Sequence, residues 1–186
     1  MEPSASKKGI TKQVVFLIVL ALIVGLVVAV QFASKRSGTR KIIGRGDRAP
    51  EFRLMSVDGT QVDLAGMKGK VVMVHFWATW CPPCVEELPT LAVLNNAMTG
   101  KDFVLLAVSV DEGGAGVVTA FLQKNGLNLP VLLDPGHETA SLYGTFKFPE
   151  TYIIDRGGIV RQKVIGAMDW RDSQALQMLN DLLASR

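Results

Sequence analysis

Val71-Val-Met-Val-His-Phe-Trp77-Ala-Thr-Trp80-Cys81-Pro82-Pro83-Cys84 is the stretch that decides the fold. Its first half, 71–77, is an almost unbroken apolar run, which predicts a buried strand. The two cysteines that follow, spaced C-x-x-C, are the only ones in the protein. Pro82 and Pro83 suit a first helical turn, because they lack amide protons and have φ fixed near the helical value. The sequence therefore predicts a strand, a tight turn and a helix, with Cys81 at the helix N-terminus.

This placement predicts a redox role for the two thiols. Unpaired amides and the helix dipole stabilise a thiolate at Cys81, which makes it the expected nucleophile, with Cys84 as the resolving thiol. A purely structural disulfide would stabilise little, because the loop it closes is short. A zinc site needs four ligands, and only His75 and His137 remain, neither at ligand spacing. We therefore expect Cys81 to attack a substrate disulfide and Cys84 to resolve the mixed disulfide.

Composition indicates one membrane segment and one globular domain. The chain has 186 residues, 48% of them hydrophobic, and a net charge of +3. Residues 1–45 carry eight Lys/Arg and one acid, whereas residues 46–186 carry twelve basic and sixteen acidic side chains. The basic excess therefore belongs to the membrane flanks, and no basic patch on the domain suggests nucleic-acid binding.

An uncharged run from Gln13 to Ser34 predicts a transmembrane signal anchor. It exceeds the roughly 7–15 apolar residues of a cleaved signal peptide, and Gln31-Phe-Ala33 is a poor cleavage site. We therefore expect a cytoplasmic N-terminus at 1–12, the anchor at 13–34, a basic linker at 35–46 and the domain at 47–186. Positive charges flank both ends of the anchor, so they do not fix its orientation. The dithiol indicates the orientation, because an anchored dithiol domain is most useful outside the cytoplasm.

The remaining pattern predicts a mixed α/β sheet with helices on both faces. Asp58-Gly59 separates two alternating segments, a strong hairpin signal. The helix after Cys84 is expected to end near Gly100 and to be kinked at Pro89. Strands are predicted at 51–55, 60–64, 103–110, 130–134, 151–155 and 159–165, and helices at 115–124, 138–143 and after a cap at Asp169 or Asp172.

Glu87 is the candidate base for Cys84, which must lose its proton to act. It lies three residues beyond Cys84 and so near it on the helix, whereas Glu86 projects to the opposite side. A carboxyl group in apolar surroundings has a raised pKa, which suits proton transfer. The alternative is a first-turn acid that complements the helix dipole. Trp80 is expected in the apolar rim that receives substrate, whereas Trp170 carries no comparable signal.

Taken together, these motifs resemble the TlpA/ResA-like group of membrane-anchored, thioredoxin-fold thiol-disulfide oxidoreductases. The resemblance covers residues 47–186 and rests on an ordered set of short motifs. They are Ala49-Pro50-x-Phe52, Asp58-Gly59, Lys68-Gly69-Lys70, the stretch 76–84, Glu87-x-Pro89, Tyr143-Gly144 and Pro149-x-Thr151-x-Ile153-Ile154-Asp155.

The resemblance implies a thioredoxin fold with an N-terminal β-hairpin and assigns further site residues. Glu87 falls at the buried active-site glutamate, and Pro149 is expected to have a cis peptide bond beside the dithiol and to present backbone to a substrate polypeptide. His75 takes the place where thioredoxin itself has a buried aspartate, the alternative being a core histidine with a satisfied hydrogen bond. Lys147 and Phe148 depart from the family pattern of a glycine and a small residue, which leaves the substrate open.

The function implied is that of an extracytoplasmic reductase, single-pass in the inner membrane with its domain on the periplasmic side. Its substrates would be disulfides in exported proteins such as apocytochrome c, since Pro149-Glu150-Thr151 is similar to cytochrome c maturation thioredoxins. A membrane thiol reductase would supply electrons, and no cofactor or metal is expected beyond the Cys81–Cys84 disulfide. Three alternatives stay open: a disulfide-donating oxidase, a copper(I) metallochaperone and a peroxidase. The lack of a Met-x-Cys-x-x-Cys loop weighs against copper.

Overall fold

The computed structural model describes residues 8–36 and 41–185, with the side chains of 14–29, 31 and 41–185. The chain divides into two compact units, Met1–Thr39 and Arg40–Arg186. The predicted cytoplasmic N-terminus (1–12) and basic linker (35–46) lie partly outside the described residues, at 1–7 and 37–40.

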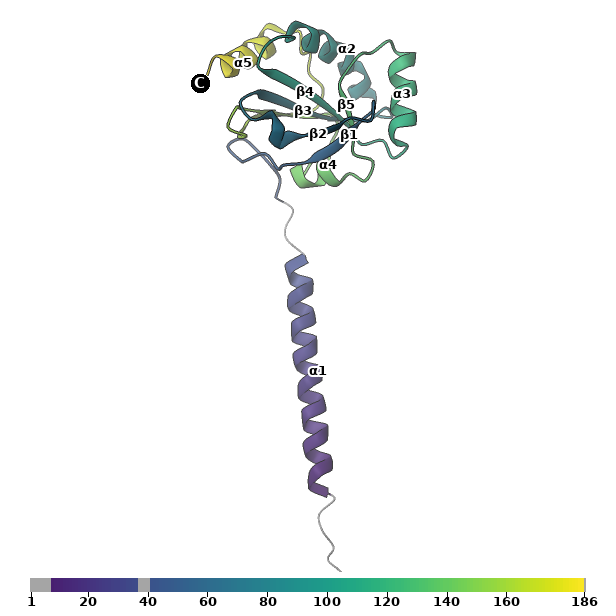
Figure 1. Cartoon of the computed structure of the whole chain (residues 1–186), viewed down its shortest axis with the longest axis vertical. Coiled ribbons are helices and arrows are strands. Elements are labelled where there is room, and N and C mark those ends of the chain that lie inside the picture. Colours follow the sequence, from purple (N-terminus) through teal and green to yellow (C-terminus); the bar gives the residue numbers. More distant parts are fainter. Residues whose placement is uncertain (1–7, 37–40, 186) are drawn as a thin grey trace, which may run out of the picture. The chain divides into compact units, whose positions relative to one another are not determined.

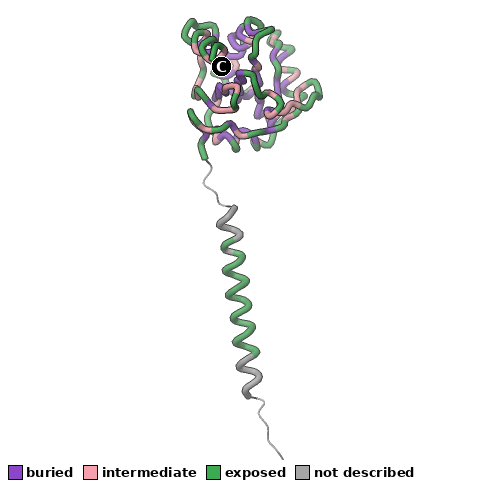
Figure 2. The backbone as a smooth tube through the Cα atoms, turned by 60° about the vertical axis from the view of Figure 1, so that its left-hand side comes forward, coloured by how far each residue is buried: buried purple, intermediate pink, exposed green. Residues whose placement is uncertain are grey.

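The first unit contains one long helix, α1 (Lys8–Arg36), drawn in purple in Figure 1. Its described side chains are exposed along its length (Figure 2). Within the described part of the chain, no helix is both long and apolar enough to cross a membrane. The predicted signal anchor at 13–34 therefore stays a prediction.

The second unit is built on a seven-stranded sheet with the strand order β2-β1-β5-β4-β3-β6-β7. The hairpin predicted at Asp58-Gly59 is confirmed, since β1 pairs with β2 in antiparallel fashion. The strands predicted at 151–155 and 159–165 form a second antiparallel pair, β6 with β7. The strands β3, β4 and β5 are parallel, whereas β6 runs antiparallel to β3. The strands are β1 (Arg53–Ser56), β2 (Gln61–Asp63), β3 (Val71–Trp77), β4 (Phe103–Ser109), β5 (Val131–Leu133), β6 (Glu150–Ile154) and β7 (Val160–Ile165).

In the described part of this unit, four α-helices accompany the sheet, close to their predicted positions, and a short 3-10 helix, η1 (Leu64–Met67), follows β2. The α-helices are α2 (Pro82–Ala97), α3 (Gly114–Lys124), α4 (Glu138–Tyr143) and α5 (Ser173–Ala184). The helix α2 continues through Pro89. Of the two caps predicted for α5, the structure selects Asp172, whose side chain accepts a hydrogen bond from the amide of Gln174. Asp169 instead pairs with Arg171 at 2.6 Å.

The central strand β3 is buried along its whole length because helices cover both faces of the sheet. Neighbouring side chains on a strand point to opposite faces. Phe76 packs on Tyr143 of α4 with ring centroids 5.4 Å apart, and Trp77 packs on Phe121 of α3 at 5.7 Å. Helices α3 and α4 therefore lie on opposite faces, and Figure 1 shows α2 and α5 across the sheet from α4. The predicted mixed sheet with helices on both faces is confirmed.

Candidate active site

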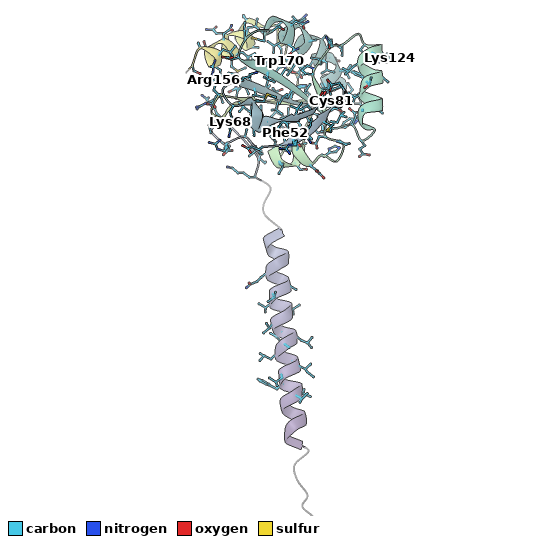
Figure 3. The ribbon with its side chains drawn as sticks, viewed as in Figure 1. Phe52, Lys68, Cys81, Lys124, Arg156 and Trp170 are labelled. Atoms are coloured by element: carbon cyan, nitrogen blue, oxygen red, sulfur yellow. A yellow bond between two sulfur atoms is a disulfide. The ribbon has the colours of Figure 1, made fainter. Side chains whose placement is uncertain are left out.

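The dithiol lies where the central strand gives way to the first helix of the domain. Cys81 is the N-cap of α2 in an extended conformation, and Pro82 and Pro83 take the first two helical positions. Cys84 supplies the first amide N–H of the helix, because a proline has none. Cys81 and Cys84 are joined in a disulfide, with Cys81 5% exposed and Cys84 fully buried. The sulfur at the helix N-terminus, labelled in Figure 3, is therefore the one nearer to solvent and to the positive end of the helix dipole.

A buried carboxylate fixes the turn that leads into Cys81. Asp111, the second residue after β4, accepts hydrogen bonds from the Thr79 amide at 3.0 Å and from the Thr79 hydroxyl at 2.6 Å. It also accepts one from the Ser109 hydroxyl at 2.7 Å. The end of β4 thus holds the residues just before the nucleophile. Asp111 was not predicted from the sequence, where its signal is an acid at the end of a buried apolar run.

The exposed rim of the site is aromatic. Trp80 is 61% exposed and meets Phe148 edge to face, with ring centroids 6.1 Å apart. Phe148 in turn lies 6.5 Å from the ring of His137, whose side chain makes no capping bond to α4. The Phe148–Pro149 peptide bond is cis, as the resemblance implied. Trp80, Phe148 and His137, which we call the aromatic rim, therefore bring the cis-proline loop beside the residue that precedes Cys81.

Glu87 is buried on the same helix as Cys84 and is held through one of its two carboxyl oxygens. The side chain is 3% exposed. Its Oε1 accepts hydrogen bonds from the indole Nε1 of Trp170 and from the Met168 amide, the latter at 3.3 Å. Its Oε2 is buried without a hydrogen-bond partner. Burial raises the pKa of Glu87 to about 7, against the lowering effect of those two hydrogen bonds.

Glu87 differs from the other buried acids of the domain in having a carboxyl oxygen without a hydrogen-bond partner. Asp111 is hydrogen-bonded as described, Asp134 accepts from two amides at the start of α4, and Glu150 pairs with Lys163 at 2.5 Å. Glu150 also accepts a hydrogen bond from the Tyr152 hydroxyl at 2.8 Å. Among the described side chains, Glu87 is the buried acid with an unpartnered oxygen, and so the one best able to take up a proton.

His75 lies in the middle of β3 and is fully buried. Its Nδ1 is 2.8 Å from the Thr151 hydroxyl across the sheet, and its Nε2 has no hydrogen-bond partner. Burial lowers the pKa of His75 to about 3, so the imidazole is neutral at physiological pH. Its satisfied Nδ1 fits the core-histidine alternative, and an active-site role stays a prediction. Within the described residues, no three or more His, Cys, Asp or Glu side chains cluster in a way that could hold a metal ion.

Trp170 is the second residue of the site that was not predicted from the sequence. It lies in the segment between β7 and α5, 83 residues from Glu87, and is fully buried. Its amide lies 3.3 Å from the Thr90 hydroxyl, which donates to the Glu87 carbonyl at 2.8 Å. The segment before α5 is therefore tied to α2 at the turn that carries Glu87 (Figure 3). Nothing in the local sequence around Trp170 signals this contact.

Comparisons with known proteins agree with this geometry. Residues 45–163 match the AhpC/TSA family. The chain is 39% identical over 149 residues to the thiol-disulfide oxidoreductase ResA of Oceanobacillus iheyensis, covering 77% of each chain. It is 34% identical over 137 residues to ResA of Bacillus subtilis, covering 74% of this chain and 73% of the relative.

Solved structures show the same fold. A crystal structure described as the thiol:disulfide interchange protein DsbE of Chlorobium tepidum superposes with a TM-score of 0.70 at 31% identity. It covers 76% of this chain and 99% of that one. StoA of Bacillus subtilis superposes with a TM-score of 0.60 at 26% identity, covering 71% and 96%. The protein therefore belongs to the AhpC/TSA family and, within its thioredoxin fold, is a thiol-disulfide oxidoreductase similar to ResA.

Proposed function

We propose that this protein reduces disulfides in exported proteins through the Cys81–Cys84 dithiol, on the extracytoplasmic side of the inner membrane. The observation that carries the proposal is the asymmetry of the disulfide. Cys81 caps α2 and is slightly exposed, whereas Cys84 is fully buried one turn further on. Only the first of these sulfurs can meet a substrate disulfide without unfolding the helix.

The reaction begins with the reduced dithiol. The Cys81 thiolate attacks one sulfur of the substrate disulfide, forming a mixed disulfide and releasing the other substrate sulfur as a thiolate. Cys84 then loses its proton to Glu87 and attacks the Cys81 sulfur, so that the second substrate sulfur leaves. Two electrons pass to the substrate, which becomes a dithiol, and the protein ends as the disulfide. A membrane thiol reductase would restore the dithiol.

The substrate side of the proposal rests on the aromatic rim. An extended polypeptide could lie along the cis-Pro149 loop, with backbone pairing for affinity and its side chains against Trp80 and Phe148. Apocytochrome c before haem attachment is the substrate class that the resemblance implies. The large Phe148 narrows the approach beside Pro149, and we expect it to favour small residues next to the substrate cysteine.

Membrane anchoring is proposed from the sequence. The run 13–34 has no charge and is long enough to span a bilayer. The full chain should remain in the membrane pellet after alkaline carbonate washing, and externally added protease should digest the domain in cells whose outer layers have been opened. Release by carbonate, or protection of the domain from protease, would contradict this topology.

The reduction potential tests the direction of electron flow. We expect the full chain in detergent, equilibrated against thiol–disulfide buffers, to give a value near the roughly −270 mV of thioredoxin, because a reductant must have a stable disulfide. A value near about −120 mV would mean a stabilised dithiol and an oxidase instead.

A further inference from the structure

We propose that Trp170 is a positioning residue that holds Glu87 through Oε1 and leaves Oε2 as the oxygen that exchanges a proton with Cys84. The inference rests on the proposed role of Glu87 as the proton acceptor. It assigns a function to the segment between β7 and α5, which lies far from the C-x-x-C motif in sequence.

Both lone pairs of the Glu87 Oε1 are occupied, which leaves none for a proton. A carboxyl oxygen has two lone pairs, and here the Trp170 indole N–H and the Met168 amide both donate to Oε1. A proton on Oε1 would occupy one of these lone pairs, so at least one of the two hydrogen bonds would be lost. The neutral form of Glu87 must therefore carry its proton on Oε2.

Oε2 is the oxygen of Glu87 that gains most from a proton. It is buried and has no partner among the described atoms. A buried charged oxygen without a hydrogen bond is costly, so a proton on Oε2 relieves that cost. When Cys84 ionises, its proton passes from Sγ to Oε2, no electrons move, and Oε1 keeps its two hydrogen bonds throughout.

Trp170 is held in place beside Glu87. Its indole is fully buried, and its amide is tied to Thr90 on α2. A hollow of about 260 Å³ lies beside Glu87. It is lined by Glu86 and Thr90 of α2 and, from the segment between β7 and α5, by residues 167–169 and Arg171. The charges around it are Glu86 on α2 and the Asp169–Arg171 ion pair at 2.6 Å. On the central strand β3, the buried titratable side chain is His75, which is neutral. None of these groups donates to Glu87, which leaves Trp170 as the side chain that sets its orientation.

The decisive variant is Trp170→Phe, which removes the N–H donor and keeps an aromatic ring. Loss of a hydrogen bond to the carboxylate form should raise the pKa of Glu87 by about one unit. The carboxyl carbon shift of Glu87, in the full chain in detergent with ¹³C-labelled glutamate, reports this pKa directly, with Glu87→Gln used for assignment. Resolution of a mixed disulfide at pH 7 should slow about fivefold, because fewer molecules hold the carboxylate, and should recover above about pH 9.

Trp77→Phe is the matched control. Trp77 is also fully buried, but its Nε1 has no partner, so the substitution removes the same volume without removing a donor to Glu87. In Trp77→Phe, the pKa of Glu87 should be unchanged. If Trp170→Phe does not fold, β-(3-benzothienyl)alanine at position 170 keeps the shape of the indole and lacks only the N–H.

An unchanged Glu87 pKa in the position-170 variant, or an equal shift in Trp77→Phe, would show that Trp170 only packs. The two proposals fail separately. Unaltered resolution kinetics in Glu87→Gln would remove the role of Glu87 as a base, whereas the carboxyl titration tests the contact with Trp170 whatever that result.

Discussion

Cys84→Ser is expected to trap substrate on the protein as a stable mixed disulfide and to reduce turnover by a factor on the order of 10³ or more, the scale on which loss of an essential catalytic group acts. Cys81 remains at the N-terminus of α2 and can still attack a substrate disulfide. No second thiol is left to resolve the adduct, because these are the only cysteines in the chain. The adduct should be seen by non-reducing electrophoresis and mass spectrometry after incubation with a disulfide-bearing protein.

Cys81→Ser is the matched control for this experiment. It leaves Cys84, which is fully buried in the disulfide form, as the one remaining thiol. It should be equally inactive but should form little mixed disulfide. Capture by Cys81→Ser and none by Cys84→Ser would reverse the roles of the two thiols.

The elements around the dithiol were predictable because their signals are local. The apolar run of β3 is buried at every position, and the prolines after Cys81 occupy the start of α2. The hairpin around Asp58-Gly59 follows from turn chemistry that involves only neighbouring residues. In each case, the residues that determine the element lie within it.

The support of the site was not predictable, because it depends on contacts between distant segments. Asp111 lies 32 residues from Thr79, and Trp170 lies 83 residues from Glu87. A single tryptophan in a polar segment does not show which buried group its N–H will meet. Glu87 was found from its spacing to Cys84, but the sequence could not show which of its oxygens is held.

The buried acids illustrate how the same residue type takes different tasks in this domain. Asp111 and Asp134 are saturated by hydrogen bonds and fix turns, and Glu150 is neutralised by Lys163. Glu87 has two donors on one oxygen and none on the other. Its environment therefore favours the neutral acid enough to bring the pKa to about 7, where a proton can be gained and lost during turnover.

Glu87→Gln is expected to slow resolution of the mixed disulfide by a factor on the order of 10², the usual contribution of a positioned base. The amide cannot take the proton of Cys84, so the rate should also lose its rise with pH through about 7. Single-turnover kinetics between pH 5 and 9 would measure both effects. Glu86→Gln, an exposed neighbour on the same helix, is the control and should behave as the unmodified protein.

The same substitution has a predicted effect on stability. The pKa of Glu87 is about 7 in the folded protein against 4.5 for an unperturbed glutamate side chain, so between these pH values the folded state holds a proton that the unfolded state has lost. The free energy of unfolding should therefore decrease as pH rises through this window, by about 3 kcal/mol for this group. Glu87→Gln should remove this contribution to the pH dependence. Relative to the unmodified protein, the variant should therefore be more stable above pH 7 than it is below pH 4.5.

Chemical unfolding of the oxidised domain, residues 40–186, measures this effect as the difference between Glu87→Gln and the unmodified domain, because buried His75, whose lowered pKa gives the opposite pH dependence, is present in both and neither cysteine titrates while the disulfide is intact. The matched Glu86→Gln protein should keep the slope, since that side chain is exposed. If stability falls equally with pH in both variants, the fall comes from other groups and Glu87 is ionised in the folded state. A carboxylate that is ionised at rest could still complement the helix dipole, but it would have no raised pKa with which to hold the proton of Cys84 during catalysis.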